Sequence, residues 1–235
     1  MNILAFDTSS SVLSVALKTG KNKTDEARLK GFLQHAENLL PLVARLLKKQ
    51  KTSLSKIDLF LLGRGPGSFT GLRVGFATMK GFLTQSSTPC RGALSLDMIV
   101  DPIDAPEKSF LGVCLDAGRQ RIFSRLYQRK QQAWKPKGKI EMLTVEEAAL
   151  KFPPNTLLAG DALRRYETAL VEAAPEKKFV TLKENLWYPR ASTLIQWALD
   201  KPEALQPLKT ARDFIPRYFR LSEPEERKKH AAACS

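Results

Sequence analysis

The sequence predicts an α/β fold of two related subdomains, each with a central mixed sheet and flanking helices. Residues 2–18 and 110–127 share one pattern: an apolar strand reaches an Asp, the chain turns, and a second strand follows. Short apolar runs typical of buried strands also alternate with stretches of helical periodicity. The 235 residues, 43% of them hydrophobic, can bury either one large core or two small ones.

The first half holds every element of such a unit. The expected order is a strand at 2–7, a polar turn at 8–10, a strand at 11–18, a possible third strand after the polar stretch 19–26, a helix at 35–50, a strand at 57–62 and a helix at 68–83. The strand at 57–62 is continuously apolar, as in strands buried on both faces, and it runs into the Gly-rich turn GRGPGS. Pro41 falls inside the first helix, so we expect a kink or a late helix start there.

The second half repeats the scheme after a Pro- and Asp-bearing connection at 101–108. The expected elements are strands at 110–116, 121–127, 139–143 and 156–159, a helix opened by Thr144, and helices at 162–173 and 191–199. Thr144 with Glu147 three residues on is a capping-box pattern. We therefore predict an N-terminal subdomain at 1–104, a C-terminal subdomain at 105–221 whose last helix is able to pack back on the first, and a flexible tail at 222–235.

Charge is the most unusual property of the composition. Lys and Arg number 38 against 24 Asp and Glu, which gives a net charge of +14 and favours an anionic partner. The densest run, without an intervening acid, is Arg119, Arg121, Arg125, Arg129, Lys130, Lys135, Lys137 and Lys139. A solvated face is the ordinary interpretation of such a run; the alternative is a strip that faces RNA, with Arg119, Arg121 and Arg125 as the candidate contacts.

The sequence lacks the residues that several classes of chemistry require. The 3 cysteines have no CxxC spacing and there are only 2 histidines, so neither a disulfide framework nor a zinc site is predicted. The turn GRGPGS lacks the Lys of a Walker A loop, and no GxSxG motif occurs. Nowhere do eighteen apolar residues run together, and no signal peptide is recognisable. We expect a cytoplasmic protein with no cofactor and no membrane contact.

Three glycines mark one side of the second helix. Gly67, Gly71 and Gly75 follow at four-residue steps, although each Gly inside a helix costs about 1 kcal/mol relative to Ala. A smooth helix face permits close approach of another backbone. Its neighbour could be the rest of this fold, a helix of a partner chain or a ligand phosphate.

Two aspartates and one histidine are candidates for a site. Asp7 and Asp116 stand at strand ends, where a duplicated nucleotide-binding fold would hold magnesium and phosphate; Thr8, Ser9 and Gly118 would accompany them, unless both aspartates only brace their turns. A metal site on the first helix would need a second histidine four residues after His35, where Leu39 stands. No metal site is therefore predicted.

Several segments are familiar. They are ILAFDTSSSVLSVAL, HAENLLPLVARLL, GRGPGSFTGLRVGFATMKG, SLD at 95–97, LDAGR at 115–119, GDAL at 160–163, YPRAS at 188–192 and the closing IPRYFR. In this order, over most of the chain, they resemble the TsaB (YeaZ) family, bacterial proteins required to make threonylcarbamoyladenosine in tRNA. GRGPGSFTGLR is highly specific, and the segments after Asp101 are looser.

The resemblance implies an actin-like ATPase (ASKHA) fold and a non-catalytic subunit. Such proteins are scaffolds that dimerise with TsaD through their first two helices while TsaD transfers threonylcarbamoyl to the adenosine beside the anticodon. TsaE joins through the TsaB–TsaD pair, tRNA is met indirectly, and the isolated chain is expected to form a homodimer. TsaD carries a paired-histidine metal motif where this chain has His35 and Leu39. The alternative is an active ATP-dependent phosphotransferase or metallopeptidase-like member of the same superfamily.

The partner-binding residues that the resemblance implies lie on both helices. They are His35, Ala36, Leu39, Leu40, Val43, Leu47, Gly67, Phe69, Gly71, Leu72, Gly75 and Met79. One departure concerns the second hairpin. The stretch after Asp116 lacks the acidic residue usual in the family, which weakens a nucleotide or tRNA role there.

Overall fold

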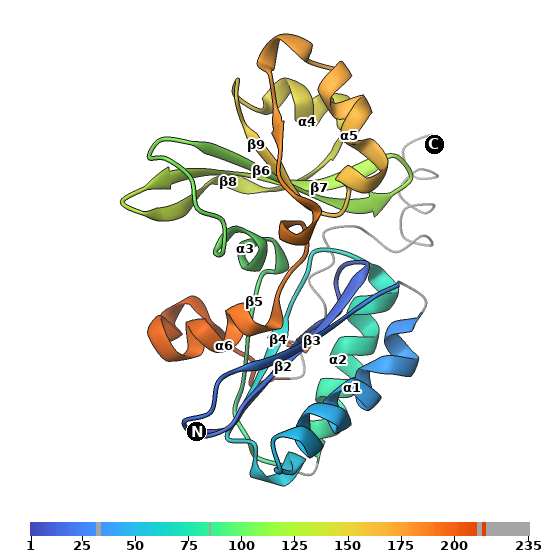
Figure 1. Ribbon diagram of the computed structural model, residues 1–235. Helices are drawn as coiled ribbons and strands as arrows, with labels where there is room; N and C mark the ends of the chain where they lie inside the picture. The colour runs from blue at the N-terminus through green and yellow to red at the C-terminus, as the bar shows by residue number, and fades with distance from the viewer. Residues whose placement is uncertain (32–33, 85, 211–212, 215–235) are drawn as a thin grey trace.

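The computed structural model describes residues 1–31, 34–84, 86–210 and 213–214 (Figure 1). Two mixed sheets lie one above the other, each with helices against its faces, and the long chain segments that connect them pass close to α3 (Ser95–Val100). The predicted tail 222–235 lies outside the described residues. The subdomain boundary after residue 104 remains a prediction.

The lower sheet in Figure 1 is built mainly from the first half of the chain. Its strands are β1 (Ile3–Asp7), β2 (Val12–Lys18), β3 (Asp25–Lys30), β4 (Leu59–Gly63), β5 (Cys90–Ala93) and β11 (Gln206–Pro207). Helices α1 (His35–Lys49) and α2 (Phe69–Thr84) cover one face, and α6 (Ala191–Asp200) packs on the other. Every residue of β1 is buried, as expected for a central strand between two helical layers.

The upper sheet belongs to the second half. Its strands are β6 (Phe110–Gly118), β7 (Arg121–Lys130), β8 (Ala133–Thr144), β9 (Leu157–Ala159) and β10 (Val180–Thr181), with helices α4 (Val145–Lys151) and α5 (Leu163–Glu172). The predicted capping box at α4 is confirmed, because Thr144 Oγ1 accepts from the Glu147 amide and Glu147 Oε2 from the Thr144 amide. Short 3-10 helices occur at Leu54–Lys56, Pro175–Lys177, Glu184–Leu186 and Pro202–Ala204.

The two sheets repeat one topology, as the paired hairpins in the sequence predict. The strand order is β5-β4-β1-β2-β3, extended by β11, in the first sheet and β10-β9-β6-β7-β8 in the second. In each sheet the first strand of the half pairs antiparallel with the next strand and parallel with the fourth. The last helix of each half then crosses over, because Leu96 and Ile99 of α3 join the core of the second sheet while Leu194 and Ile195 of α6 join that of the first.

Some elements differ from the predicted ones. Helix α1 begins at His35 with Pro41 in its interior, so Pro41 does not delay the helix. Strand β8 starts at Ala133 rather than at 139, because an edge strand tolerates Lys, Pro and Gly on its open side. Sequence periodicity also missed α3 and the short strands β5, β10 and β11, which are too brief to show a period.

Candidate functional site

Helix α1 presents an apolar stripe to its own sheet. His35, Leu39 and Val43 are buried under the helix, and Leu39 and Val43 pack in the core with β1 and β2. His35 Nε2 lies 2.9 Å from the carbonyl oxygen of Ser10, in the turn between β1 and β2. Leu40, by contrast, is 53% exposed. The buried stripe therefore belongs to this fold, and a metal pair cannot form with a leucine in the second position.

The glycine side of α2 meets the same turn. A Cβ on Gly71 would lie 2.1 Å from the Thr8 carbonyl oxygen, and one on Gly75 would lie 2.4 Å from Thr8 Oγ1. A Cβ on Gly67, whose φ is +153°, would lie 2.1 Å from the Ser9 carbonyl oxygen. Of the three neighbours considered for this glycine face, the structure shows the one within this chain, which is the β1–β2 turn. Contact of these glycines with a partner chain stays a prediction; within this chain the β1–β2 turn fills the space in front of them.

The predicted partner-binding residues thus divide by exposure. His35, Leu39, Val43, Gly71, Leu72, Gly75 and Met79 are buried within this chain, Leu47 and Gly67 are half-buried, and Ala36, Leu40 and Phe69 are exposed. The buried members contact this fold with their side chains or Cα atoms, and partner binding by all of these residues stays a prediction. Phe69, at the first turn of α2, is 46% exposed and has the Arg73 guanidinium 5.4 Å from its ring centroid.

The exposed members gather near one end of the helix pair. The Ser68 amide donates to the Ser9 carbonyl oxygen at 2.7 Å, and His35 contacts the adjacent Ser10 carbonyl. Both helices therefore begin at the β1–β2 turn and run side by side from it (Figure 1). Leu40 and Phe69 lie within the first two turns of neighbouring parallel helices.

Asp7 braces the β1–β2 turn. Its Oδ1 accepts from the Ser9 amide at 2.9 Å and from Ser9 Oγ at 2.7 Å, and its Oδ2 accepts from Ser95 Oγ at 2.6 Å. Burial raises the pKa of Asp7, although the hydrogen bonds from Ser95 and Ser9 lower it. Asp7, Thr8 and Ser9 are all buried. Protein donors occupy the carboxylate, and contact of these residues with a nucleotide stays a prediction.

The second hairpin supplies a looser version of the same turn. The Gly118 amide donates to Asp116 Oδ1 at 2.7 Å, and Gly118 has a φ of +72°. Asp116 is half-buried, so this turn is not sealed as the first one is. A nucleotide role for Asp116 and Gly118 stays a prediction.

Asp161, which is not among the predicted site residues, joins the two halves. It follows β9, and its Oδ1 accepts from the Asp116 amide at 3.0 Å while its Oδ2 accepts from the Ser11 amide at 3.2 Å. One buried carboxylate thus holds the first turn of each half. The GDAL segment after a strand was the available signal, but only the topology places it opposite Ser11.

The environment of Asp161 makes the stability of the fold depend on pH. Burial, reinforced by the charges of Asp116 and Asp7, raises its pKa to about 6, against the lowering effect of its two amide hydrogen bonds. An acid with a raised pKa in the folded state binds a proton more readily there than in the unfolded chain. Its stabilising effect is therefore present at low pH and is lost as the pH rises through about 6.

We expect the free energy of unfolding to rise by about 2 kcal/mol from this group as the pH falls from 7 to 4.5. Asp161→Asn should remove that part of the slope. Urea unfolding of both proteins at closely spaced pH values measures it. Parallel pH profiles for the two proteins would contradict the assignment.

The loop GRGPG and the segment SLD are held to each other. Ser95 Oγ accepts from the Gly65 amide at 3.0 Å while it donates to Asp7, and the Ser95 amide donates to the Gly65 carbonyl oxygen at 2.9 Å. Asp97 Oδ1, two residues on, accepts from the Tyr127 hydroxyl at 2.6 Å on β7. These two motifs therefore position α3 between the sheets.

The run of eight cations is spread along the β7–β8 hairpin. In the β7–β8 register Arg121 pairs with Thr144 and Lys130 pairs with Ala133, so the two ends of β7 stand roughly 30 Å apart. Arg125 is half-buried, with its guanidinium 3.4 Å from Asp97 Oδ1 and 3.2 Å from the Gly138 carbonyl oxygen. Arg125 thus has an acidic partner within the chain, and tRNA contact by Arg119, Arg121 and Arg125 stays a prediction.

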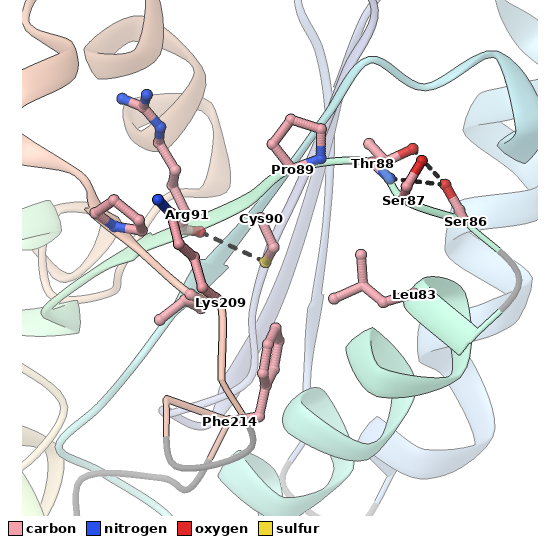
Figure 2. A pocket seen from close by; sticks show the side chains of 11 residues that line it. Leu83, Ser86, Ser87, Thr88, Pro89, Cys90, Arg91, Lys209 and Phe214 are labelled. Carbon is pink, nitrogen blue, oxygen red and sulfur yellow. Dashed lines mark hydrogen bonds between the residues drawn. The ribbon is translucent and has the colours of Figure 1, made fainter.

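A cavity of about 490 Å³ lies at the far end of α2 (Figure 2). It is lined by the end of α2, by β5 and by the segment after β11, and Figure 2 shows the Cys90 sulfur pointing from the strand toward Phe214, with Leu83 to one side. Burial raises the pKa of Cys90 to about 12, and that of Cys114 likewise to about 12. Both thiols are therefore protonated near neutral pH, so neither is an activated nucleophile.

The described part of the chain contains no cluster of metal-binding side chains. Residues 1–31, 34–84, 86–210 and 213–214 contain no group of three or more His, Cys, Asp or Glu side chains that could hold an ion. Among the same residues, no helix is long and apolar enough to cross a membrane.

The repeated topology, with the last helix of each half packed on the other sheet, is that of the actin-like (ASKHA) class of proteins. A family model described as "TsaD: tRNA N6-adenosine threonylcarbamoyltransferase" matches residues 31–189, more than half of the chain. The structure of YeaZ from Pseudomonas aeruginosa superimposes with a TM-score of 0.72 at 26% identity, covering 92% of this chain and 100% of that one. The predicted actin-like (ASKHA) fold is confirmed.

Sequence relatives narrow the assignment. TsaB of Buchnera aphidicola is 37% identical over 98 residues, which is 42% of this chain and 44% of that protein. TsaB of Escherichia coli is 36% identical over 96 residues, which is 41% of each chain. TsaB of Bacillus subtilis is 25% identical over 235 residues, 96% of each chain. This chain belongs to the TsaB/YeaZ family of tRNA threonylcarbamoyladenosine biosynthesis proteins.

Proposed function

We propose that this chain is a non-catalytic subunit that binds a TsaD protein and supports the transfer of threonylcarbamoyl to adenosine in tRNA. In this role TsaE reaches the chain through the pair with TsaD, and tRNA is met through the complex. In the absence of TsaD, a second copy of the chain covers the same surface. The names of the relatives and of the matching family model support this role.

One observation carries the proposal: the end of the α1–α2 pair nearest the β1–β2 turn exposes large apolar side chains. Leu40 and Phe69 are 53% and 46% exposed, with the small residue Ala36 exposed beside them on α1. Apolar side chains gathered on a regular helical face are typical of surfaces that bind another protein. The core beneath them is complete, so this face can bind without refolding.

The site geometry supports a role without catalysis. On α1 the position that would complete a histidine pair is Leu39, which is buried in the core. Asp7, the residue a phosphotransferase would need, has both carboxylate oxygens bound by serine donors. The metallopeptidase alternative therefore lacks its second histidine, and the phosphotransferase alternative has its aspartate engaged by Ser9 and Ser95.

Sedimentation velocity on the chain mixed with TsaD from the same organism tests the proposal. We expect a heterodimer peak to replace the peaks of the separate proteins at micromolar concentration. The chain alone should sediment as a dimer that dissociates when TsaD is added. Two unchanged peaks in the mixture would contradict the proposed role.

A further inference from the structure

A cavity of about 360 Å³ lies at the seam between the two sheets, away from the α1–α2 face. It is walled by α3, by the ends of β7 and β8 next to their connecting turn, and by the end of α6 with the turn after it. Its volume falls in the range of about 300–1,000 Å³ found for small-molecule sites. Neither the proposed association with TsaD nor the Asp7 region uses it.

Two of the 3 tryptophans of the chain line this cavity. Trp134, on β8, is half-buried and is fixed by a hydrogen bond from its Nε1 to the Ile103 carbonyl oxygen at 2.7 Å. Trp197, on α6, is buried, and its Nε1 has no hydrogen-bond partner among the described residues. The wall of the cavity therefore contains two indole rings, one from β8 and one from α6.

Two cations lie against these indole rings. The Arg129 guanidinium is 5.6 Å from the Trp134 ring centroid, and Lys201 Nζ is 4.9 Å from that of Trp197. Arg129 is paired with Asp104 at 3.1 Å, but the Asp104 side chain is 96% exposed. A pair with so exposed a partner is weak, and an incoming anion can replace it.

The acids that line the cavity have partners of their own. Asp97 accepts from the Tyr127 hydroxyl and from Arg125, and Asp101 pairs with Lys201.

Outside the rim of the cavity, further positive charges follow along β8. Lys135 and Lys137 are exposed on either side of Pro136, and neither forms an ion pair with another described residue.

We infer that this cavity accepts one nucleotide of a single-stranded RNA, its base against Trp134 and its phosphate at Arg129. Aromatic side chains beside cations are the usual means of binding single-stranded nucleic acid. The strand would continue over Lys135 and Lys137, on the outer edge of β8. This contact is made by the chain alone, so it goes beyond a role as partner of TsaD, in which tRNA is met indirectly.

Fluorescence anisotropy with a labelled oligoadenylate of seven nucleotides, at 50 mM salt, tests the inference. Trp134→Ala should lower the affinity about tenfold, the loss expected for one stacked base, whereas Trp134→Phe keeps most of it. Arg129→Gln should lower the affinity to a similar degree and make it less sensitive to salt. Arg165→Gln, an exposed arginine on α5 that loses the same charge, is the matched control.

Three results would overturn the inference: no binding by the wild type, losses in the cavity variants no larger than that of Arg165→Gln, or duplex RNA bound as tightly as the single strand. Because Trp134→Ala also removes a hydrogen bond, its folding is checked by thermal unfolding. If it fails to fold, the wild-type chain is titrated separately with AMP, adenosine and inorganic phosphate. Quenching of tryptophan fluorescence then measures the binding of each probe. AMP should bind more tightly than either part, and equal binding of phosphate and AMP would overturn the stacked base.

Discussion

Leu40→Arg is expected to weaken the association with TsaD about a hundredfold while leaving the fold intact. Leu40 is 53% exposed, so its replacement leaves no hole in the core. In the complex the same position would bury an unpaired guanidinium in an apolar contact, which costs about 3 kcal/mol. Phe69→Arg should behave in the same way. Titration calorimetry with TsaD measures both.

Leu150→Arg supplies the matched control, because Leu150 is 67% exposed on α4 of the second half. It adds the same charge to the same type of residue on a surface that the proposal leaves free. Its affinity for TsaD should equal that of the wild type. If Leu40→Arg and Leu150→Arg bound TsaD alike, the α1–α2 face would not be the contact.

Gly71→Ala should lower the free energy of unfolding by about 3 kcal/mol, although Ala is the better helix former. The added Cβ would lie 2.1 Å from the Thr8 carbonyl oxygen, and a backbone atom cannot turn away as a flexible side chain can. Either α2 or the β1–β2 turn must shift, and the turn also contacts His35 and Asp7. Urea unfolding followed by circular dichroism measures the loss.

Gly81 gives the comparison within the same helix. A Cβ there would meet nothing within 4 Å, so Gly81→Ala should raise the stability by up to about 1 kcal/mol from helix propensity alone. The two substitutions should therefore have opposite signs. A stable Gly71→Ala protein would mean that α2 does not approach the turn as closely as described.

Much of the fold could be predicted because its signals are local. The buried stripe of α1, the strand before GRGPG and the capping box at Thr144 each depend on residues within one element. The repeated hairpin likewise predicted two halves of one topology. Short elements such as β5 and α3 gave no such signal, because four to six residues cannot display a period.

The site was harder to predict, because the sequence does not say which surface a buried residue faces. The spacing of Gly71 and Gly75 indicates a close neighbour, but the neighbour is Thr8, more than sixty residues away. The apolar stripe of α1 is equally compatible with a core and with a partner chain. Asp161 could not be paired with Ser11 without the topology, and the cationic run was spread along the hairpin by the strand register.

The most direct test is a transfer assay with unmodified tRNA, threonylcarbamoyl-adenylate and purified components from one organism. The chain alone should leave the tRNA unmodified, TsaD and TsaE without it should be nearly inactive, and adding the wild-type chain should restore threonylcarbamoyladenosine formation. The Leu40→Arg chain should restore little. Formation of the modified nucleoside by the chain alone, without TsaD, would contradict its assignment as a subunit that acts through another protein's active centre.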